Sequence, residues 1–193
     1  MKQVADAILK EIQLRYHTQN SFLIAIDGRC AAGKTTLSEY LQKNIDSNVF
    51  HMDHFFLRPE QRTKERLQQP GGNVDYERFY EEVLLPLSQG IPIAYRSYDC
   101  QQQKLAAPIS IDPKPISIIE GSYSCHPKLW DTYDLRIFLT VPFEEQLRRI
   151  ESRNGLDRLS VFREKWIPME EQYFTAFQIQ TRCELLFQTV EGL

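Results

Sequence analysis

Eight consecutive residues, Gly28 to Thr35, read Gly-Arg-Cys-Ala-Ala-Gly-Lys-Thr and match the full pattern G-x-x-x-x-G-K-[ST]. This pattern is typical of a loop whose backbone N–H groups bind phosphate at a helix N-terminus. In such a loop the lysine, here Lys34, reaches the β- and γ-phosphates, and the last hydroxyl, here Thr35, binds Mg²⁺. The predicted nucleotide-binding residues are Gly28, Arg29, Cys30, Ala31, Ala32, Gly33, Lys34, Thr35 and Thr36.

The flanking sequence supplies the context that this loop requires. An apolar run at 22–26 precedes it, and a helix-like segment at 36–41 follows it. Strand, loop and helix in this order favour a nucleoside triphosphate site. The alternative is a glycine-containing helix start with an exposed lysine.

Two acidic residues stand where later strands are expected to end. Ligands of open α/β sheets lie at the carboxyl ends of the strands, so polar residues there are candidates for the site. Asp53 follows the run 48–52 and is the candidate base that accepts the proton of an attacking hydroxyl. Glu120 ends the run 116–119 and is the candidate acid near Mg²⁺. Their alternatives are a helix-cap aspartate and a solvated strand-end acid.

A cluster of arginines follows the last of the long apolar runs. Arg149 and Arg153 lie four residues apart, and hence on one face of a helix. Arginines on a mobile cover can offset charge on a phosphoryl group in transfer. Nearby glutamates leave open a solvated face of ion pairs. The cluster comprises Arg148, Arg149, Arg153, Arg158 and Arg163, and the glutamates are Glu144, Glu145 and Glu151.

Alternation of apolar strand-like runs with helical patterns predicts a doubly wound parallel sheet, an α/β fold. Residues 57–74 carry Pro, Gly and many charges and are expected to be a mobile excursion. Residues 91–115 hold four prolines and are expected to form a hairpin-like insertion on the acceptor side. Strands are expected at 21–27, 48–52, 115–120, 135–140 and 184–188, and helices at 2–16, 34–44, 76–88, 143–153 and 158–180.

Composition excludes several classes of protein. The 193 residues suit one domain, with 42% hydrophobic and 25% charged residues, as in soluble globular proteins. A net charge of −3 argues against nucleic-acid and anionic-membrane partners. No run is long enough to cross a bilayer and the first residues lack a signal-peptide core, so a cytoplasmic location is expected. Four scattered cysteines favour reduced thiols over a zinc site or disulfides, and the histidines show no metal-ligand spacing.

With these residues the chain resembles the uridine kinase-like family of P-loop kinases, which includes uridine–cytidine, nicotinamide riboside, phosphoribulo- and bacterial pantothenate kinases. The likeness runs from about residue 20 to the C-terminus, and the sequence is most similar to bacterial uridine kinase-like proteins. Asp53-His54-Phe55-Phe56 resembles the family's D-x-F-[FY] element, whose aspartate is the base. Ile118-Ile119-Glu120-Gly121 resembles its strand-end E-G, and Arg148-Arg149-Ile150 with Arg153 resembles its lid, here about 148–163.

The resemblance also implies residues on the acceptor side. Tyr98 lies in Arg96-Ser97-Tyr98-Asp99, which is similar to the family's Y-D element, where the tyrosine faces the substrate. Asp75 aligns near acids that hold sugar hydroxyls. Gln103 replaces a base-reading histidine of uridine–cytidine kinases, and Asn154 replaces the usual lid aspartate. The expected substrate-side residues are Asp53, Asp75, Tyr98, Gln103 and Arg158.

These observations predict a single-domain kinase that transfers the γ-phosphoryl group of ATP, with Mg²⁺, to a primary hydroxyl of a nucleoside or ribosyl-like acceptor. The expected partner is therefore a small molecule, and a homodimer is left open. Two alternatives are a kinase for a vitamin-like alcohol and a nucleotide-binding regulator without small-molecule phosphorylation. GTPase behaviour is disfavoured, because the chain has no N-K-x-D or D-x-x-G element.

Overall fold

The computed structural model describes residues 2–16 and 21–190 and shows an α/β fold around a five-stranded parallel sheet. The strand order is β2-β7-β1-β8-β9, and two short antiparallel pairs, β3 with β6 and β4 with β5, lie outside this sheet. The predicted fold and all five predicted strands are confirmed. The strands are β1 Phe22–Gly28, β2 Ser47–His51, β3 Ile93–Tyr95, β4 Tyr98–Asp99, β5 Lys104–Leu105, β6 Ile109–Ile111, β7 Ile116–Glu120, β8 Leu135–Thr140 and β9 Leu185–Gln188.

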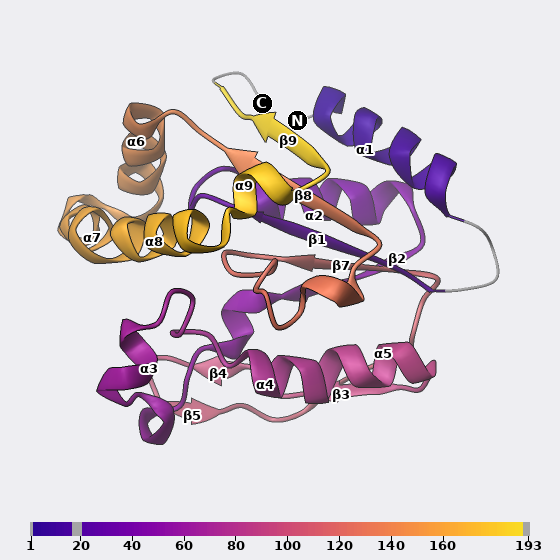
Figure 1. Cartoon of the computed structure of the whole chain (residues 1–193), viewed down its shortest axis with the longest axis horizontal. Coiled ribbons are helices and arrows are strands. Elements are labelled where there is room, and N and C mark those ends of the chain that lie inside the picture. Colours follow the sequence, from indigo (N-terminus) through magenta and orange to yellow (C-terminus); the bar gives the residue numbers. More distant parts are fainter. Residues whose placement is uncertain (1, 17–20, 191–193) are drawn as a thin grey trace.

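Every residue of β1 is buried, because helices cover both faces of the sheet. Alternate side chains enter two separate apolar cores: Ile24 and Ile26 pack with α1 and α2, while Leu23 and Ala25 face the side of α4 and α8. Figure 1 shows α1 and α2 on one side of the sheet and α4 and α5 on the other. The α-helices are α1 Lys2–Arg15, α2 Lys34–Asn44, α3 Lys64–Gln68, α4 Tyr76–Phe79, α5 Leu85–Gln89, α6 Phe143–Asn154, α7 Leu156–Val161, α8 Ile167–Phe177 and α9 Ile179–Arg182.

The predicted helices at 76–88 and 158–180 each contain a segment of π-helix. Residues 80–84 (η3) join α4 to α5, and residues 162–166 (η5) join α7 to α8. A proline, Pro86 or Pro168, follows each π segment by two residues. Proline lacks the N–H of a regular helix and its ring clashes with the preceding turn, which accounts for the widened turns. Short 3₁₀ turns also occur at η1 Met52–Phe55, η2 Pro59–Gln61 and η4 Trp130–Thr132.

The two irregular regions differ in how well they follow the predictions. The hairpin expected within 91–115 is present as the β3–β6 and β4–β5 pairs. The segment 57–74, expected as a mobile excursion, instead contains η2 and α3 and is tied down by Arg66. The guanidinium of Arg66 donates to the carbonyl oxygens of Gly72 and Val74 and pairs with Glu77.

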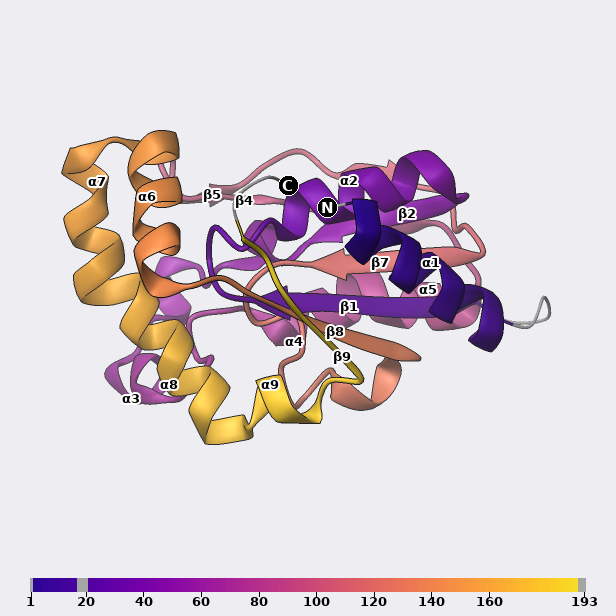
Figure 2. The same ribbon diagram turned by 90° about the horizontal axis from the view of Figure 1, so that it is seen from above.

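Because the main-sheet strands are parallel, their carboxyl ends share one edge. The register places Glu120, at the end of β7, beside Ile26 of β1 and His51 of β2. Figures 1 and 2 show α6, α7 and α8 beyond this edge, past the heads of the strand arrows. All four cysteines are free thiols. Within the described ranges, no helix combines the length and apolar character needed to span a membrane.

Candidate active site

The phosphate loop begins at the end of β1 with a glycine that no other residue could replace without strain. Gly28 has φ +135°, and a Cβ built on it would lie 2.0 Å from the Leu139 carbonyl oxygen. The loop then turns into α2 along the wall of a cavity of about 1110 Å³. Its lining includes the loop residues Cys30, Ala31, Gly33, Lys34, Thr35 and Thr36.

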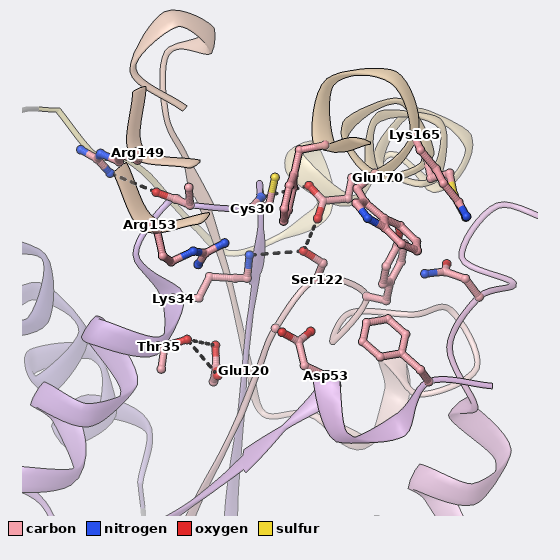
Figure 3. A pocket seen from close by; sticks show the side chains of 18 of the residues that line it. Cys30, Lys34, Thr35, Asp53, Glu120, Ser122, Arg149, Arg153, Lys165 and Glu170 are labelled. Atoms are coloured by element: carbon pink, nitrogen blue, oxygen red, sulfur yellow. Dashed lines mark hydrogen bonds between the residues drawn. The ribbon is translucent and has the colours of Figure 1, made fainter. Parts of the chain in front are cut away.

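The Lys34 ammonium lies under the loop, almost fully buried. Its Nζ donates to the carbonyl oxygens of Gly28 (2.7 Å) and Arg29 (3.0 Å) and lies 3.3 Å from Ser122 Oγ. Figure 3 shows it at the centre of the cavity, with Ser122 on one side and Arg153 on the other. These contacts hold a fixed positive charge next to the loop amides.

A carboxylate from α8 reaches this same loop. Glu170 is 6% exposed, accepts a hydrogen bond from the Cys30 N–H (2.9 Å) and accepts another from Ser122 Oγ (2.6 Å). Burial raises the pKa of Glu170, and the Lys34 charge opposes this effect. An anionic side chain therefore already contacts one of the N–H groups of the anion-binding loop (Figure 3).

Oxygen atoms from α2 and β7 meet at the next position. Thr35 Oγ1 lies 3.2 and 3.3 Å from the two carboxylate oxygens of Glu120. His51 Nδ1 lies 2.5 Å from Glu120 Oε1, and this hydrogen bond raises the pKa of His51. A hydroxyl and one carboxylate are ligands that fit Mg²⁺, which keeps several waters and takes its other ligands from substrate phosphates. Within the described part of the chain, no group of three or more His, Cys, Asp or Glu side chains is arranged to hold a metal alone.

Asp53 lies at the start of η1, directly after β2, and opens into the same cavity. Gly121, at φ +134°, allows this approach: a Cβ there would lie 3.0 Å from Met52 Cβ and 3.6 Å from Asp53 Oδ1. The Asp53 side chain is exposed and lines the cavity. Desolvation of the carboxylate raises the pKa of Asp53; the Lys34 charge opposes this and the Glu120 charge adds to it. Figure 3 shows Asp53, Glu120 and Lys34 around one space.

The α6 arginines line the cavity on the side opposite Lys165 (Figure 3). Arg149 is held in place by Glu145, the Ala31 carbonyl oxygen and Thr189. Arg153 donates its Nε to Asn154 and points toward Lys34. Arg149 thus fixes α6 against the loop, while the Arg153 guanidinium faces the cavity.

A buried carboxylate that the sequence reading did not select holds the edge of the sheet together. Asp27 is fully buried at the end of β1 and accepts hydrogen bonds from the N–H groups of Gly28, Tyr123 and Cys125. It also accepts one from the Tyr173 hydroxyl at 2.9 Å. Burial raises the pKa of Asp27 to about 6, and the hydrogen bonds and Lys34 only partly offset this. Asp27 thereby links the phosphate loop, the segment after β7 and α8.

Four expected substrate-side residues are not among those that line the cavity. Asp75 is buried as the N-cap of α4, where it accepts from the Arg78 N–H. The Tyr98 hydroxyl accepts a hydrogen bond from Arg62. Gln103 lies exposed in the turn between β4 and β5 at φ +52°, and Arg158 is on an exposed face of α7. Local demands of capping, packing and turn geometry determine these positions.

Part of the predicted loop set also lies outside the cavity. The Gly28 and Ala32 N–H groups bond to Asp27 and to the Arg29 carbonyl oxygen. The Arg29 side chain turns away to form a bidentate ion pair with Glu171 (2.6 and 2.9 Å), beside a smaller cavity of about 460 Å³. Cys30 does line the cavity, and burial raises the pKa of its thiol to about 12.

Two residues that the sequence analysis did not select, Glu170 and Asp27, have recognisable sequence contexts. Glu170 interrupts the buried stripe of α8 formed with Ile167, Tyr173 and Phe174. Asp27 is an acid at the end of an otherwise apolar, fully buried strand. A lone carboxylate on a buried face is unusual and could have marked both positions.

The chain matches curated kinases over roughly two thirds of their length. Nicotinamide riboside kinase 1 of Homo sapiens is 32% identical over 69% of this chain and 65% of the human protein. The Rattus norvegicus protein of the same name is 32% identical over 69% of this chain and 67% of its own length. A uridine kinase of Staphylococcus epidermidis is 26% identical over 70% of each chain. No family model matches the chain.

Solved structures show the same fold over most of the chain. One from Bacillus stearothermophilus, described as a possible uridine kinase, has a TM-score of 0.69 at 17% identity and covers 97% of this chain and all of its own (100%). D-glycerate 3-kinase from Cryptococcus neoformans has a TM-score of 0.62 at 13% identity, covering 89% and 87% of the two chains. These matches agree with the fold predicted from the alternation of strands and helices.

Proposed function

Because the chain belongs to the uridine kinase-like family of P-loop kinases, we propose that it transfers the γ-phosphoryl group of ATP, with Mg²⁺, to a primary hydroxyl of a nucleoside or ribosyl-like acceptor. One observation carries this proposal: the phosphate loop and the Asp53 carboxylate open into one continuous cavity. Its volume is about 1110 Å³, at the upper end of the roughly 300–1,000 Å³ typical of ligand pockets.

The nucleotide end of the cavity consists of the loop, Lys34 and the Thr35–Glu120 pair. The loop N–H groups and Lys34 bind the phosphates, because their partial and full positive charges converge on one space. Thr35 and Glu120 would hold Mg²⁺ through their oxygens. The metal would neutralise charge that develops on the phosphates during transfer.

The acceptor hydroxyl lies against Asp53, which orients it and takes its proton. The new O–P bond forms as the bond from the γ-phosphorus to the bridging oxygen breaks, and ADP leaves with that oxygen. Desolvation raises the pKa of Asp53, and this makes the carboxylate a stronger base than an ordinary aspartate. Arg153, which points toward Lys34 (Figure 3), offsets charge on the transferring group. Most of the rate acceleration then comes from positioning and electrostatics, because phosphoryl transfer asks little covalent chemistry of the protein.

A coupled assay of ADP release tests this proposal with uridine, cytidine, nicotinamide riboside and pantothenate as acceptors. A kinase releases ADP only when Mg²⁺ and one class of acceptor are present. Lys34→Met, which removes the loop charge, serves as the inactive reference. Slow ADP release that ignores the acceptor would instead identify a nucleotide-binding regulator, and preference for pantothenate would identify a kinase of vitamin-like alcohols.

A further inference from the structure

Beyond Asp53, the cavity continues between two segments of the chain, 56–73 and 162–169. We call this part of the cavity the acceptor arm. Lys165 belongs to this arm, and Figure 3 shows it on the side of the cavity opposite Arg149 and Arg153. The nucleotide end is therefore on one side of Asp53 and the acceptor arm is on the other.

The walls of the acceptor arm are largely apolar and aromatic. Phe56 comes from the segment after η1, while Phe162, Trp166 and Met169 come from η5 and α8. Each of these side chains is partly exposed to the cavity. Such walls suit a planar or compact apolar body and supply no charge of their own.

Two cations interrupt these walls. Arg62 is held by hydrogen bonds from Nε to the Leu57 carbonyl oxygen and from Nη2 to the Tyr98 hydroxyl, both 3.0 Å, and its guanidinium lies 5.6 Å from the Tyr98 ring centroid. The Lys165 ammonium lies 4.7 Å from the Trp166 ring centroid. Across residues 2–16 and 21–190, neither cation has a carboxylate within ion-pair distance.

The carboxylates that line the cavity do not balance these charges. Glu120 and Glu170 are bound to the Thr35 hydroxyl and the Cys30 N–H of the nucleotide end, and Glu145 pairs with the α6 arginines. Asp53 is the proposed base. The acceptor arm therefore presents two positive charges and an apolar surface, with no acid of its own among the lining residues.

Asn73 also lines the arm and is only 8% exposed. Its Oδ1 is enclosed by protein and has no hydrogen-bond donor among the described residues, so a ligand in the cavity does not reach this oxygen. The polar character of the arm therefore comes mainly from the two cations.

We propose that the acceptor is an acid: it carries a carboxylate or phosphate whose charge Arg62 and Lys165 recognise. This inference rests on the proposed function, because it names the acceptor of that reaction. A planar guanidinium fixed by two hydrogen bonds is suited to a carboxylate or phosphate. A cationic acceptor such as nicotinamide riboside is disfavoured by the same charges.

Matched pairs of acceptors test the charge of the substrate while keeping the hydroxyl constant. ADP release is compared for uridine and orotidine, uridine and uridine 3′-phosphate, and nicotinamide riboside and nicotinic acid riboside. We expect kcat/KM to be about tenfold higher for the acidic member of at least one pair, and this preference to fall with added salt. Orotidine and uridine 3′-phosphate distinguish a carboxylate from a phosphate.

Charge-neutral variants then identify the residues. Arg62→Gln and Lys165→Gln should each remove most of the acidic preference, measured as the ratio of kcat/KM between the acidic and neutral members of a pair. Arg163→Gln, on the same π segment as Lys165 but outside the cavity, is the matched control. Melting curves of each variant establish that it is folded.

The outcomes separate the two proposals. ADP release with equal or better use of the neutral members contradicts the acidic acceptor and leaves the kinase assignment standing. An acidic preference that survives in both variants also contradicts it, because other residues would then read the charge. Absence of ADP release with every acceptor in both panels contradicts the proposed function, and the acidic acceptor falls with it.

Discussion

At the scale of single residues, the Asp53 carboxylate makes the most direct prediction. Asp53→Asn keeps the size of the side chain and removes its ability to take a proton. We expect ATP binding to persist and turnover to fall at least about 10²-fold, the usual loss for a general base. Steady-state ADP release and ATP titration calorimetry measure the two effects. Asp6→Asn, an exposed change on α1, is the control; near-normal turnover of the Asp53 variant would exclude its role as base.

Asp27 predicts a dependence of stability on pH. Its pKa is about 6 in the folded chain and 3.8 ordinarily, so the folded state binds the extra proton between these values. Its contribution to the free energy of unfolding is therefore full below pH 3.8 and is lost as pH rises through 6. The difference between these two pKa values corresponds to about 3 kcal/mol of unfolding free energy. Urea unfolding of the wild type and Asp27→Asn from pH 4 to 8 checks this.

We expect the wild-type free energy of unfolding, relative to that of Asp27→Asn, to decline between pH 4 and 6.5 and then to level off. A difference that rises over this range would mean that the carboxylate is stabilised as an anion by its N–H donors more than burial penalises it. The Asn variant supplies the reference because its side chain does not titrate in this range.

At the scale of secondary-structure elements, α8 carries a negative charge to the phosphate loop. Glu170→Gln keeps a side chain that can accept from the Cys30 N–H but removes the charge that opposes bound phosphates. We expect ATP affinity to rise about tenfold, a modest repulsion at the distances of neighbouring groups. Calorimetry with ATP, and with adenosine as a ligand without phosphates, measures this. Glu164→Gln, outside the cavity, is the control; equal ATP affinity in wild type and Glu170→Gln would show that the carboxylate moves aside without cost.

The elements also show what sequence can predict. The apolar runs predicted every strand of the main sheet, because a buried parallel strand is a continuous run of apolar residues. The phosphate loop and the strand-end residues Asp53 and Glu120 follow from the same local logic, and the structure gathers them in one cavity. The Tyr173–Asp27 bond, by contrast, joins residues 146 positions apart, and no local pattern encodes it. The bond from Arg62 to the Tyr98 hydroxyl spans 36 positions and likewise has no local pattern.

At the scale of the whole molecule, the site exists only when distant parts of the chain are assembled. The cavity takes side chains from α2, η1, β7, α6 and α8, and two cores on opposite faces of the sheet hold these elements. A ligand that needs all of them binds the folded chain and not the unfolded one. Its binding free energy therefore adds to the stability of the entire fold.

We accordingly expect Mg²⁺–ATP to raise the melting temperature. At about 100 times Kd the added stability is about 2.7 kcal/mol, or roughly 5–10 °C for a chain of this size. Lys34→Met should lose most of this rise, because the buried Lys34 ammonium is the charge proposed to bind the phosphates. Lys128→Met, outside the cavity, should keep it. Scanning calorimetry of the three proteins, with and without ligand, makes the comparison. If the ligand raised the melting temperatures of Lys34→Met and the wild type equally, the nucleotide would be bound elsewhere. The cavity at the carboxyl edge of the sheet would then not be the nucleotide site.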